Sequence, residues 1–366
     1  MLKSALVCLI AASLPFLGSC GSKGDEPRKP GNGNPGIVNP TPDPEPEPDP
    51  EPTTGKIIVA YVTSWSSVLP NPRYMTHINY AFGHVTDNFK GVRIDNDQRL
   101  RQIANLKKNN PDLKVLLSVG GWGSGRFSEM AADAENRSSF AKDCKRVIDQ
   151  YNLDGIDIDW EFPGNDAGGL ISCSPNDTKN YTLLMQDIRE AIGPDHLLTL
   201  ATVVSGDYID LADIMPYVDF VNIMAYDMEN APKHNAGLYR SKHTGWICGD
   251  EGVKRHLKKG VPADKLVLGM PFYGHGKSPY AQTVDYKDIH VLSGCTERWD
   301  DIAKSPYMEN ANGELVLSYD NARSLSIKCD YIIENGLKGA MYWDYAGDDA
   351  NSTLRSAVAK KLIGLK

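Results

Sequence analysis

The most informative stretch of this sequence is Asp154-Gly155-Ile156-Asp157-Ile158-Asp159-Trp160-Glu161, which Phe162-Pro163-Gly164 follow directly. Side chains of a strand alternate between two faces, so from Gly155 onward one face carries acids and the other carries large apolar residues. The acids are Asp157, Asp159 and Glu161, spaced about 6–7 Å apart along the strand. Because Pro163 and Gly164 end the strand, we expect Glu161 near its carboxyl-terminal mouth.

This acidic face has three competing interpretations. A calcium loop opens with D-x-D-x-D but needs glycine at its sixth position, where this sequence has Phe162. A solvated edge strand would place the acids in water, but it gives no reason for acids to occupy one face only. In a cleft, neighbouring carboxyl groups cannot all ionise at low cost, so at least one should hold a proton near neutral pH. A protonated carboxyl group beside a carboxylate is the equipment of glycoside hydrolysis, and we favour this third interpretation.

From Lys56 onward, apolar runs alternate with helix-like segments, a pattern typical of a parallel α/β fold. The predicted strands are 57–62, 77–82, 115–119, 155–161, 197–204, 220–226, 266–273 and 340–345. Apolar spacing predicts helices over 136–151, 176–192 and 322–334. Eight strands over about 310 residues favour a TIM (β/α)8 barrel. A doubly wound sheet is disfavoured because no Gly-rich dinucleotide fingerprint follows the first strand.

The connection between the seventh and eighth predicted strands is too long for an ordinary barrel loop. It covers about 45 residues, 274–318, whereas such loops usually have about 2–6 residues. The segment brings its own aromatic residues, namely Tyr280, Tyr286, Trp299 and Tyr307. We therefore expect a small insertion with a structure of its own.

The first 55 residues are expected to lie outside the folded domain. Lys3 and the apolar run over 4–16 are typical of an export signal, and the run is too short to span a membrane. Leu17-Gly18-Ser19-Cys20 resembles a bacterial lipoprotein cleavage box, which predicts removal of residues 1–19 and a membrane anchor on Cys20. An ordinary secretory signal is the alternative. Proline at every second position from Pro40 to Pro52 predicts an extended linker over 20–55, ahead of a domain over 56–366.

Charge and cysteine usage narrow the class of partner. The chain has net charge −8, of which about −5 falls on the domain, and this mild acidity argues against nucleic acid.

Export permits disulfides, but the five cysteines of the mature domain are an odd number, so at least one stays unpaired. They are Cys144, Cys173, Cys248, Cys295 and Cys329. No spacing among them, or with the histidines, is that of a zinc site, and we expect neither metal nor cofactor.

The acidic strand also carries a resemblance. D-G-I-D-I-D-W-E matches the pattern D-x-x-D-x-D-x-E in full, and the chain thereby resembles glycoside hydrolase family 18, the chitinases and their relatives. Four further motifs stand in the family's order at predicted strand ends. They are Ser118-Val119-Gly120-Gly121, Met224-Ala225-Tyr226-Asp227, Met270-Pro271-Phe272-Tyr273 and Gly339-Ala340-Met341-Tyr342-Trp343. The resemblance covers essentially the whole domain, and the long insertion resembles, in shorter form, one that walls the cleft in many of these enzymes.

The resemblance implies catalytic roles for four residues. Glu161 would be the general acid that protonates the leaving oxygen. Asp159 would hydrogen-bond the acetamido nitrogen of the substrate, and Asp157 would share a proton with it deeper in the barrel. Tyr226 would hold the acetamido carbonyl, although a tyrosine in an apolar strand is more often part of a core. Asp154 is out of phase with the acidic face, so both a structural and a functional role remain open.

Eight further residues are expected around the substrate: Phe82, Gly120, Gly121, Trp122, Met224, Asp227, Tyr273 and Trp343. Trp343 resembles the tryptophan that forms the floor under the sugar at the scissile bond, and Trp122 is a candidate for the adjacent subsite. The two glycines indicate a close approach of the backbone to the sugar or to a neighbouring strand. Trp65, Trp246 and Trp299 fit either the core or the cleft.

The expected protein is therefore a monomeric, retaining glycosidase that cuts β-1,4-linked N-acetylglucosamine in chitin or chito-oligosaccharides. Family 18 is an exception to the two-carboxylate scheme, because the acetamido group of the substrate serves as the nucleophile. One alternative is an endo-β-N-acetylglucosaminidase that acts on N-glycan cores. Another is a non-catalytic carbohydrate-binding surface protein, although such relatives typically lose an acid of the motif and Glu161 is present.

Residues 21–55 should contribute nothing to folding, because a proline-rich acidic segment has little apolar surface to bury. A chain shortened to begin at Gly55 should be soluble, and its melting temperature should equal that of a chain that begins at residue 21. Scanning calorimetry of both chains checks this expectation. A melting temperature several degrees lower for the shorter chain would place the domain boundary upstream of Gly55.

Overall fold

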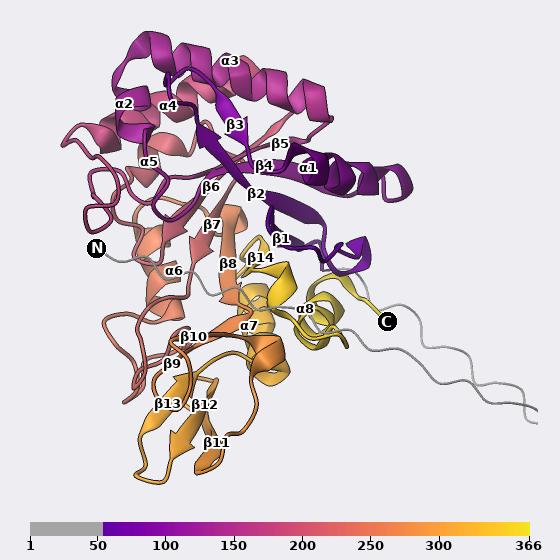
Figure 1. Ribbon diagram of the computed structural model, residues 1–366, viewed down its shortest axis with the longest axis vertical. Coiled ribbons are helices and arrows are strands. Elements are labelled where there is room, and N and C mark those ends of the chain that lie inside the picture. Colours follow the sequence, from indigo (N-terminus) through magenta and orange to yellow (C-terminus); the bar gives the residue numbers. More distant parts are fainter. Residues whose placement is uncertain (1–53) are drawn as a thin grey trace, which may run out of the picture. The chain divides into compact units, whose positions relative to one another are not determined.

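The computed structural model describes residues 54–366, and eight parallel strands of this part close into a barrel (Figure 1). The barrel strands are β1 (Ile57–Thr63), β2 (His77–Val85), β4 (Lys114–Gly120), β5 (Gly155–Asp159), β6 (Leu197–Val203), β7 (Phe220–Met224), β8 (Leu266–Pro271) and β14 (Gly339–Trp343). They follow one another around the barrel in this order, and β1 pairs with both β2 and β14, which closes the ring. A short strand, β3 (Val92–Ile94), adds antiparallel to β2. The predicted TIM barrel is confirmed.

Helices surround the barrel (Figure 1). They are α1 (Asp97–Ala104), α2 (Phe127–Ala132), α3 (Ala134–Tyr151), α4 (Asp177–Ile192), α5 (Leu211–Ile214), α6 (Gly249–Lys258), α7 (Ala322–Glu334) and α8 (Thr353–Ile363). Polar side chains cap the first turn of some of these helices: Asp133 accepts a hydrogen bond from the N–H of Asn136 at α3, and Asn321 and Ser324 form a capping box at α7. Within residues 54–366, no helix has the length and apolar character needed to cross a membrane.

Several barrel strands end earlier than the sequence predicted. β5 ends at Asp159 and β7 at Met224, each two residues before the end of the predicted run. The bond from the N–H of Gly121 to the carbonyl of Asp159, at 2.8 Å, is the last bond between β4 and β5, and directly after β7 the N–H of Ala225 donates to the carbonyl of Ile223 in its own strand at 2.8 Å. Glu161 therefore lies on a loop beyond the strand, as active-site residues of barrels commonly do.

The long connection after β8 is an antiparallel sheet of five strands, which Figure 1 shows beside β8 and α7. Its strands are β9 (Tyr273–Gly276), β10 (Thr283–Asp285), β11 (Cys295–Asp300), β12 (Ser305–Asn310) and β13 (Leu315–Ser318). It has a small apolar core of its own, which includes Tyr280, Met308 and Leu317. The predicted insertion between the seventh and eighth barrel strands is therefore confirmed.

Buried polar side chains attach this insertion to the barrel loops. The imidazole of His234, on the loop after β7, is buried between two insertion strands. Its Nε2 lies 3.1 Å from Asp300 Oδ2 of β11, and its Nδ1 lies 3.2 Å from Ser318 Oγ of β13. The N–H of Tyr286 also donates to the carbonyl of Phe272 at 2.9 Å, directly after β8.

The five cysteines of residues 54–366 are all unpaired, and three of them, Cys144, Cys248 and Cys329, are buried. In the same part of the chain, no group of three or more His, Cys, Asp or Glu side chains is placed to hold a metal ion. The expected signal over 1–19, the lipid-modified Cys20 and most of the linker lie outside the described residues.

An ion pair buried beside α7 gives a test of this fold. Lys328 Nζ donates to Asp320 Oδ2, and both side chains are almost completely buried. Lys328→Met should lower the free energy of unfolding by about 3–5 kcal/mol, because it leaves a buried carboxylate without its cation. Urea unfolding measures the change.

The exposed pair of Asp330 on α7 and Lys361 on α8 is the control, and Lys361→Met should cost less than about 1 kcal/mol. The double variant Asp320→Asn/Lys328→Met should recover much of the lost stability, since it removes the unpaired charge. If Lys328→Met and Lys361→Met lowered the free energy of unfolding equally, the buried position of the Lys328–Asp320 pair would be contradicted.

Candidate active site

The carboxyl ends of the barrel strands surround a cavity of about 290 Å³. Eight of the residues expected from the sequence line it: Phe82, Trp122, Asp159, Glu161, Met224, Tyr226, Asp227 and Trp343. Tyr61 and Trp65 complete its wall. We call this the central cavity. The other expected residues contact its lining: Gly120 lies against Asp159, Gly121 against Phe82 and Tyr273 against Tyr226, and Asp157 precedes Asp159 on β5.

Asp157 is completely buried under the central cavity and is surrounded by hydrogen-bond donors. The donors are Tyr61 OH and Ser118 Oγ to Oδ2, both at 2.8 Å, and Thr199 Oγ1 at 2.6 Å and Asn222 Nδ2 at 3.2 Å to Oδ1. Burial raises the pKa of Asp157, and these four hydrogen bonds oppose the increase. The expected proton sharing with Asp159 has no hydrogen bond to support it among the described residues, because the oxygens of Asp157 already have these four partners.

Asp159 has a different environment although it lies on the same face of β5. It is 4% exposed, and its Oδ1 is buried without a hydrogen-bond partner in the described residues. Burial raises the pKa of Asp159 well above its usual range, and the negative charges of Glu161 and Asp157 add to the increase. A proton on Asp159 at neutral pH would make it a donor that faces the cavity.

Glu161 lies where the central cavity meets a second cavity of about 540 Å³. Burial, and then the negative charge of Asp227, raise the pKa of Glu161 to about 8. The side chain therefore carries its proton at neutral pH, as a general acid must. Its position on the loop after β5 leaves it open to the groups that enter both cavities.

Tyr226 and Asp227 follow β7 and face Glu161 from across the central cavity. Tyr226 is buried, and its hydroxyl has a long contact of 3.5 Å to the sulfur of Met341. Asp227 has a φ of +53°, and the side chain of Asn235 accepts a hydrogen bond from its N–H at 2.7 Å. This local bond holds Asp227 in a left-handed backbone conformation that few residues adopt.

Aromatic rings form the floor and one wall of the central cavity. The ring of Trp343 stacks on Phe82, with 5.6 Å between ring centres, and lies 5.6 Å from Tyr61. Trp65 is 67% exposed and lies 6.4 Å from Trp343. Flat apolar rings beside carboxyl groups suit the apolar face of a pyranose ring. Of the three tryptophans left open by the sequence, Trp65 and Trp246 therefore face cavities, whereas Trp299 packs 3.8 Å from the guanidinium of Arg323.

Gly120 and Gly121 allow β4 to approach its neighbours closely. Gly120 has a φ of +130°, and a Cβ there would lie 2.0 Å from the carbonyl oxygen of Asp159. A Cβ on Gly121 would lie 2.6 Å from the ring of Phe82. The sequence left open whether these glycines approach the sugar or a neighbouring strand. The structure favours the neighbouring strand for Gly120 and the aromatic wall for Gly121.

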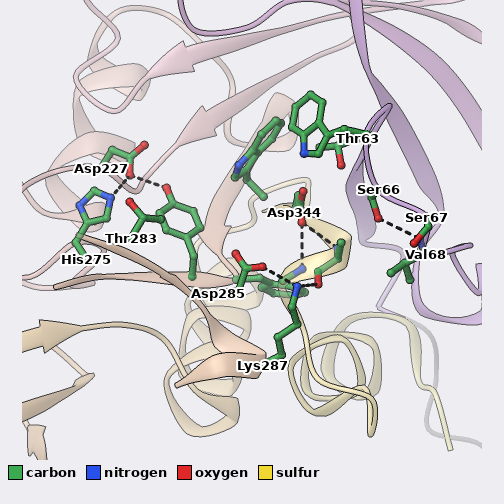
Figure 2. Close-up of a pocket in the computed structure, with 16 residues that line it drawn as sticks. Thr63, Ser66, Ser67, Val68, Asp227, His275, Thr283, Asp285, Lys287 and Asp344 are labelled. Carbon is green, nitrogen blue, oxygen red and sulfur yellow. Dashed lines mark hydrogen bonds and ion pairs between the residues drawn. The ribbon is translucent and has the colours of Figure 1, made fainter. Parts of the chain in front are cut away.

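Two larger cavities adjoin the central one, and each shares lining residues with it. The Trp65 cavity, about 620 Å³, is bounded by Trp65, Thr63, Tyr273, His275, Asp344 and an ion pair between Lys287 and Asp285 at 2.6 Å (Figure 2). The Trp246 cavity is the second cavity beside Glu161, and it is also lined by Trp122, Phe162 and Trp246. Together the three form an extended cleft with aromatic rings along it.

Several residues of the site were not identified from the sequence. Tyr61, Thr199 and Asn222 hold Asp157, and His275 bonds Asp227, yet none belongs to a family motif quoted above. Their inward positions on predicted strands were the only signal for the first three. Asp154 takes the structural role: it accepts hydrogen bonds from Lys107 Nζ and from the N–H of Val115, where β5 begins.

Comparison with known proteins agrees with this geometry. Chitinase A1 of Niallia circulans is 38% identical over 313 residues, which cover 72% of this chain and 44% of that protein. Chitotriosidase-1 of Mus musculus is 32% identical over 347 residues, which cover 80% of this chain and 73% of that protein. The chain thus spans less than half the length of the bacterial relative.

Solved structures show the same fold. A family 18 N-acetylglucosaminidase from Paenibacillus barengoltzii superposes with a TM-score of 0.76 at 32% identity, covering 84% of this chain and 100% of that one. Chitinase ChiW from Paenibacillus sp. str. FPU-7 gives 0.77 at 31% identity, covering 84% and 43%. The model of glycosyl hydrolases family 18 matches residues 57–348. The chain belongs to glycosyl hydrolases family 18.

Proposed function

We propose that this protein is a retaining glycosidase that cuts β-1,4-linked N-acetylglucosamine in chitin or chito-oligosaccharides, with the acetamido group of the substrate as nucleophile. One observation carries the mechanism. The carboxyl groups that line the central cavity are those of Asp159, Glu161 and Asp227, and Asp227 is held by the hydroxyl of Tyr273 and the ring of His275. Burial raises the pKa of Asp159 well above its usual range and that of Glu161 to about 8, which disfavours the ionised form that a carboxylate nucleophile needs, so a nucleophile is best supplied by the substrate itself.

The positions of the cavities suggest how a sugar chain lies. Glu161 must reach the oxygen between the cleaved sugar and the leaving sugar, and it lines the central and Trp246 cavities. The leaving part would therefore occupy the Trp246 cavity. The cleaved sugar would rest on Trp343, and the rest of its chain would extend into the Trp65 cavity, which Trp343 lines and Glu161 does not.

The chemical steps follow from this placement. The acetamido oxygen forms a bond to the anomeric carbon, while the bond to the leaving oxygen breaks and that oxygen takes the proton of Glu161. Asp159 and Tyr226 would orient the acetamido group, and orientation alone can supply several kcal/mol of the barrier. Water then opens the oxazolinium ring and returns a proton to Glu161. The two inversions at the anomeric carbon give net retention.

Two further parts of the proposal concern the substrate and the location. An extended cleft made of three adjoining cavities favours a linear oligomer over a branched N-glycan core, which is the alternative substrate. Products formed from chito-oligosaccharides and from a high-mannose glycoprotein distinguish the two. From residues 1–55 we also propose export, with a lipid on Cys20 that tethers a single chain to a bacterial membrane. Metabolic labelling with a fatty acid, lost in Cys20→Ala, tests the anchor.

Glu161→Gln keeps the shape of the side chain but removes the transferable proton. The rate should fall by about 10²–10⁴-fold, while binding of chito-oligosaccharides should stay within about threefold of wild type. Initial rates and calorimetric binding measure both quantities. Glu190→Gln, on the exposed face of α4, is the control and should change neither. A Glu161→Gln variant with more than about a tenth of the wild-type rate would remove Glu161 from its role.

The first product should be the β-anomer, because substrate assistance gives retention. Oligomers with glucosamine at the sugar over Trp343 should not be cut, since glucosamine has no acetamido oxygen. A thiazoline mimic of the intermediate should bind much more tightly than the parent sugar. Proton NMR of early products from matched acetylated and deacetylated oligomers is the measurement. An α-anomer that appears first, or efficient cleavage after glucosamine, would refute the mechanism.

A further inference from the structure

His275 lies on β9 and lines both outer cavities of the cleft. Figure 2 shows its ring directed at Asp227. Among the residues that line the Trp246 cavity, it is the only one that can carry a positive charge. Neither the acidic strand nor the motifs quoted from the sequence assign it a role.

The partners of the ring determine its charge. Nε2 lies 3.0 Å from Asp227 Oδ1, and Nδ1 lies 3.2 Å from the backbone carbonyl oxygen of Glu229. Both partners are acceptors, and Tyr273 OH already donates to the same oxygen of Asp227 at 2.6 Å. A neutral imidazole has one donor and one acceptor, so only the imidazolium can donate to both partners. Burial lowers the pKa of His275, but the hydrogen bond and charge of Asp227 outweigh it and raise the pKa above its ordinary value.

Within residues 54–366, the other elements around His275 bring no second cation to Asp227. In the insertion sheet, His275 lies opposite Thr283 of β10 and Ser318 of β13, which are both uncharged. The charged side chains that share a cavity with His275 are Glu161, Asp227, Asp285, Lys287 and Asp344. Lys287 is bonded to Asp285 and to the carbonyl of Ala346. Asp227 is thus the charged group that His275 contacts.

Asp227 connects His275 with the proton of Glu161. The negative charge of Asp227 is, after burial, the cause that raises the pKa of Glu161 to about 8. We propose that His275 is a positioning residue which, as an imidazolium, neutralises Asp227 and thereby sets the pH above which Glu161 loses its proton. The inference rests on the proposed role of Glu161 as general acid.

The sign of the effect follows from the charges. A positive His275 offsets Asp227, so Glu161 releases its proton more easily than it would beside an uncompensated carboxylate. When His275 loses its proton, the charge of Asp227 is uncovered, and Glu161 holds its proton up to a higher pH. Deprotonation of His275 therefore raises the pH at which Glu161 loses its proton, and activity extends toward alkaline pH.

Two substitutions separate charge from shape. His275→Arg fixes a positive charge at every working pH, and His275→Gln keeps a donor without charge. The alkaline limit of kcat/KM on chito-oligosaccharides should lie at the lowest pH for His275→Arg and at the highest pH for His275→Gln. The two limits should differ by about half a pH unit or more, so that at a pH above both limits the rates of the two variants differ about threefold. His290→Gln, an exposed histidine of the insertion, is the control and should leave the limit of the wild type unchanged.

A titration by ¹H–¹⁵N NMR of the histidine rings tests the charge without any substrate. The His275 signal, identified by its loss in His275→Gln, should titrate with a midpoint above 6.5 that falls in Asp227→Asn. A midpoint at or below 6.5, or alkaline limits that coincide for the Arg and Gln variants, would overturn the inference. If the wild type cut no N-acetylglucosamine oligomer, the proposed function would fail instead, and the titration would still decide the charge of His275.

Discussion

A carboxylate can be buried at the centre of a barrel only if hydrogen-bond donors surround it, and Asp157 is buried there. Its donors come from four strands besides its own: Tyr61 of β1, Ser118 of β4, Thr199 of β6 and Asn222 of β7. Two of them, Ser118 and Thr199, are the direct ladder partners of Asp157 in the neighbouring strands. A slip of one residue in either pairing would turn the donor to the outer face, so this one charge specifies the register of the barrel wall.

The same strand then produces three environments for three acids. Asp157 has four donors, Asp159 has an oxygen without a partner, and Glu161 lies at the mouth between two cavities. The negative charges of Asp157 and Glu161 disfavour ionisation of Asp159, whereas burial and the negative charge of Asp227 raise the pKa of Glu161. The result is a proton held at the outermost carboxyl group, where a glycosidic oxygen could receive it. Catalysis of this kind needs no unusual residue. It needs carboxyl groups whose burial and hydrogen-bond partners differ over five residues of chain.

The sequence predicted the features that depend on local periodicity. Alternation in residues 155–161 was sufficient to place the three acids on one face, and helical spacing predicted α7 over Ala322–Glu334 with its observed bounds. Features that depend on distant pairing were not predicted. Tyr61 lies 96 residues from Asp157 in the chain, and nothing near either residue indicates their hydrogen bond. His275 was missed for the same reason, since its partner Asp227 belongs to the loop of another strand.

The junction between β8 and the insertion has a mechanical consequence. β9 begins two residues after β8 ends, and the N–H of Phe272, between them, donates to the carbonyl of Trp343 at 2.7 Å. This short connection ties the first strand of the insertion directly to β8 and β14. Any displacement of its sheet would also shift Tyr273 and His275 on β9, and with them their contacts to Asp227. Replacing the insertion by one from a relative would therefore alter the electrostatics of the cleft as well as its depth, and engineering that aims at longer substrates has to keep β9 in place.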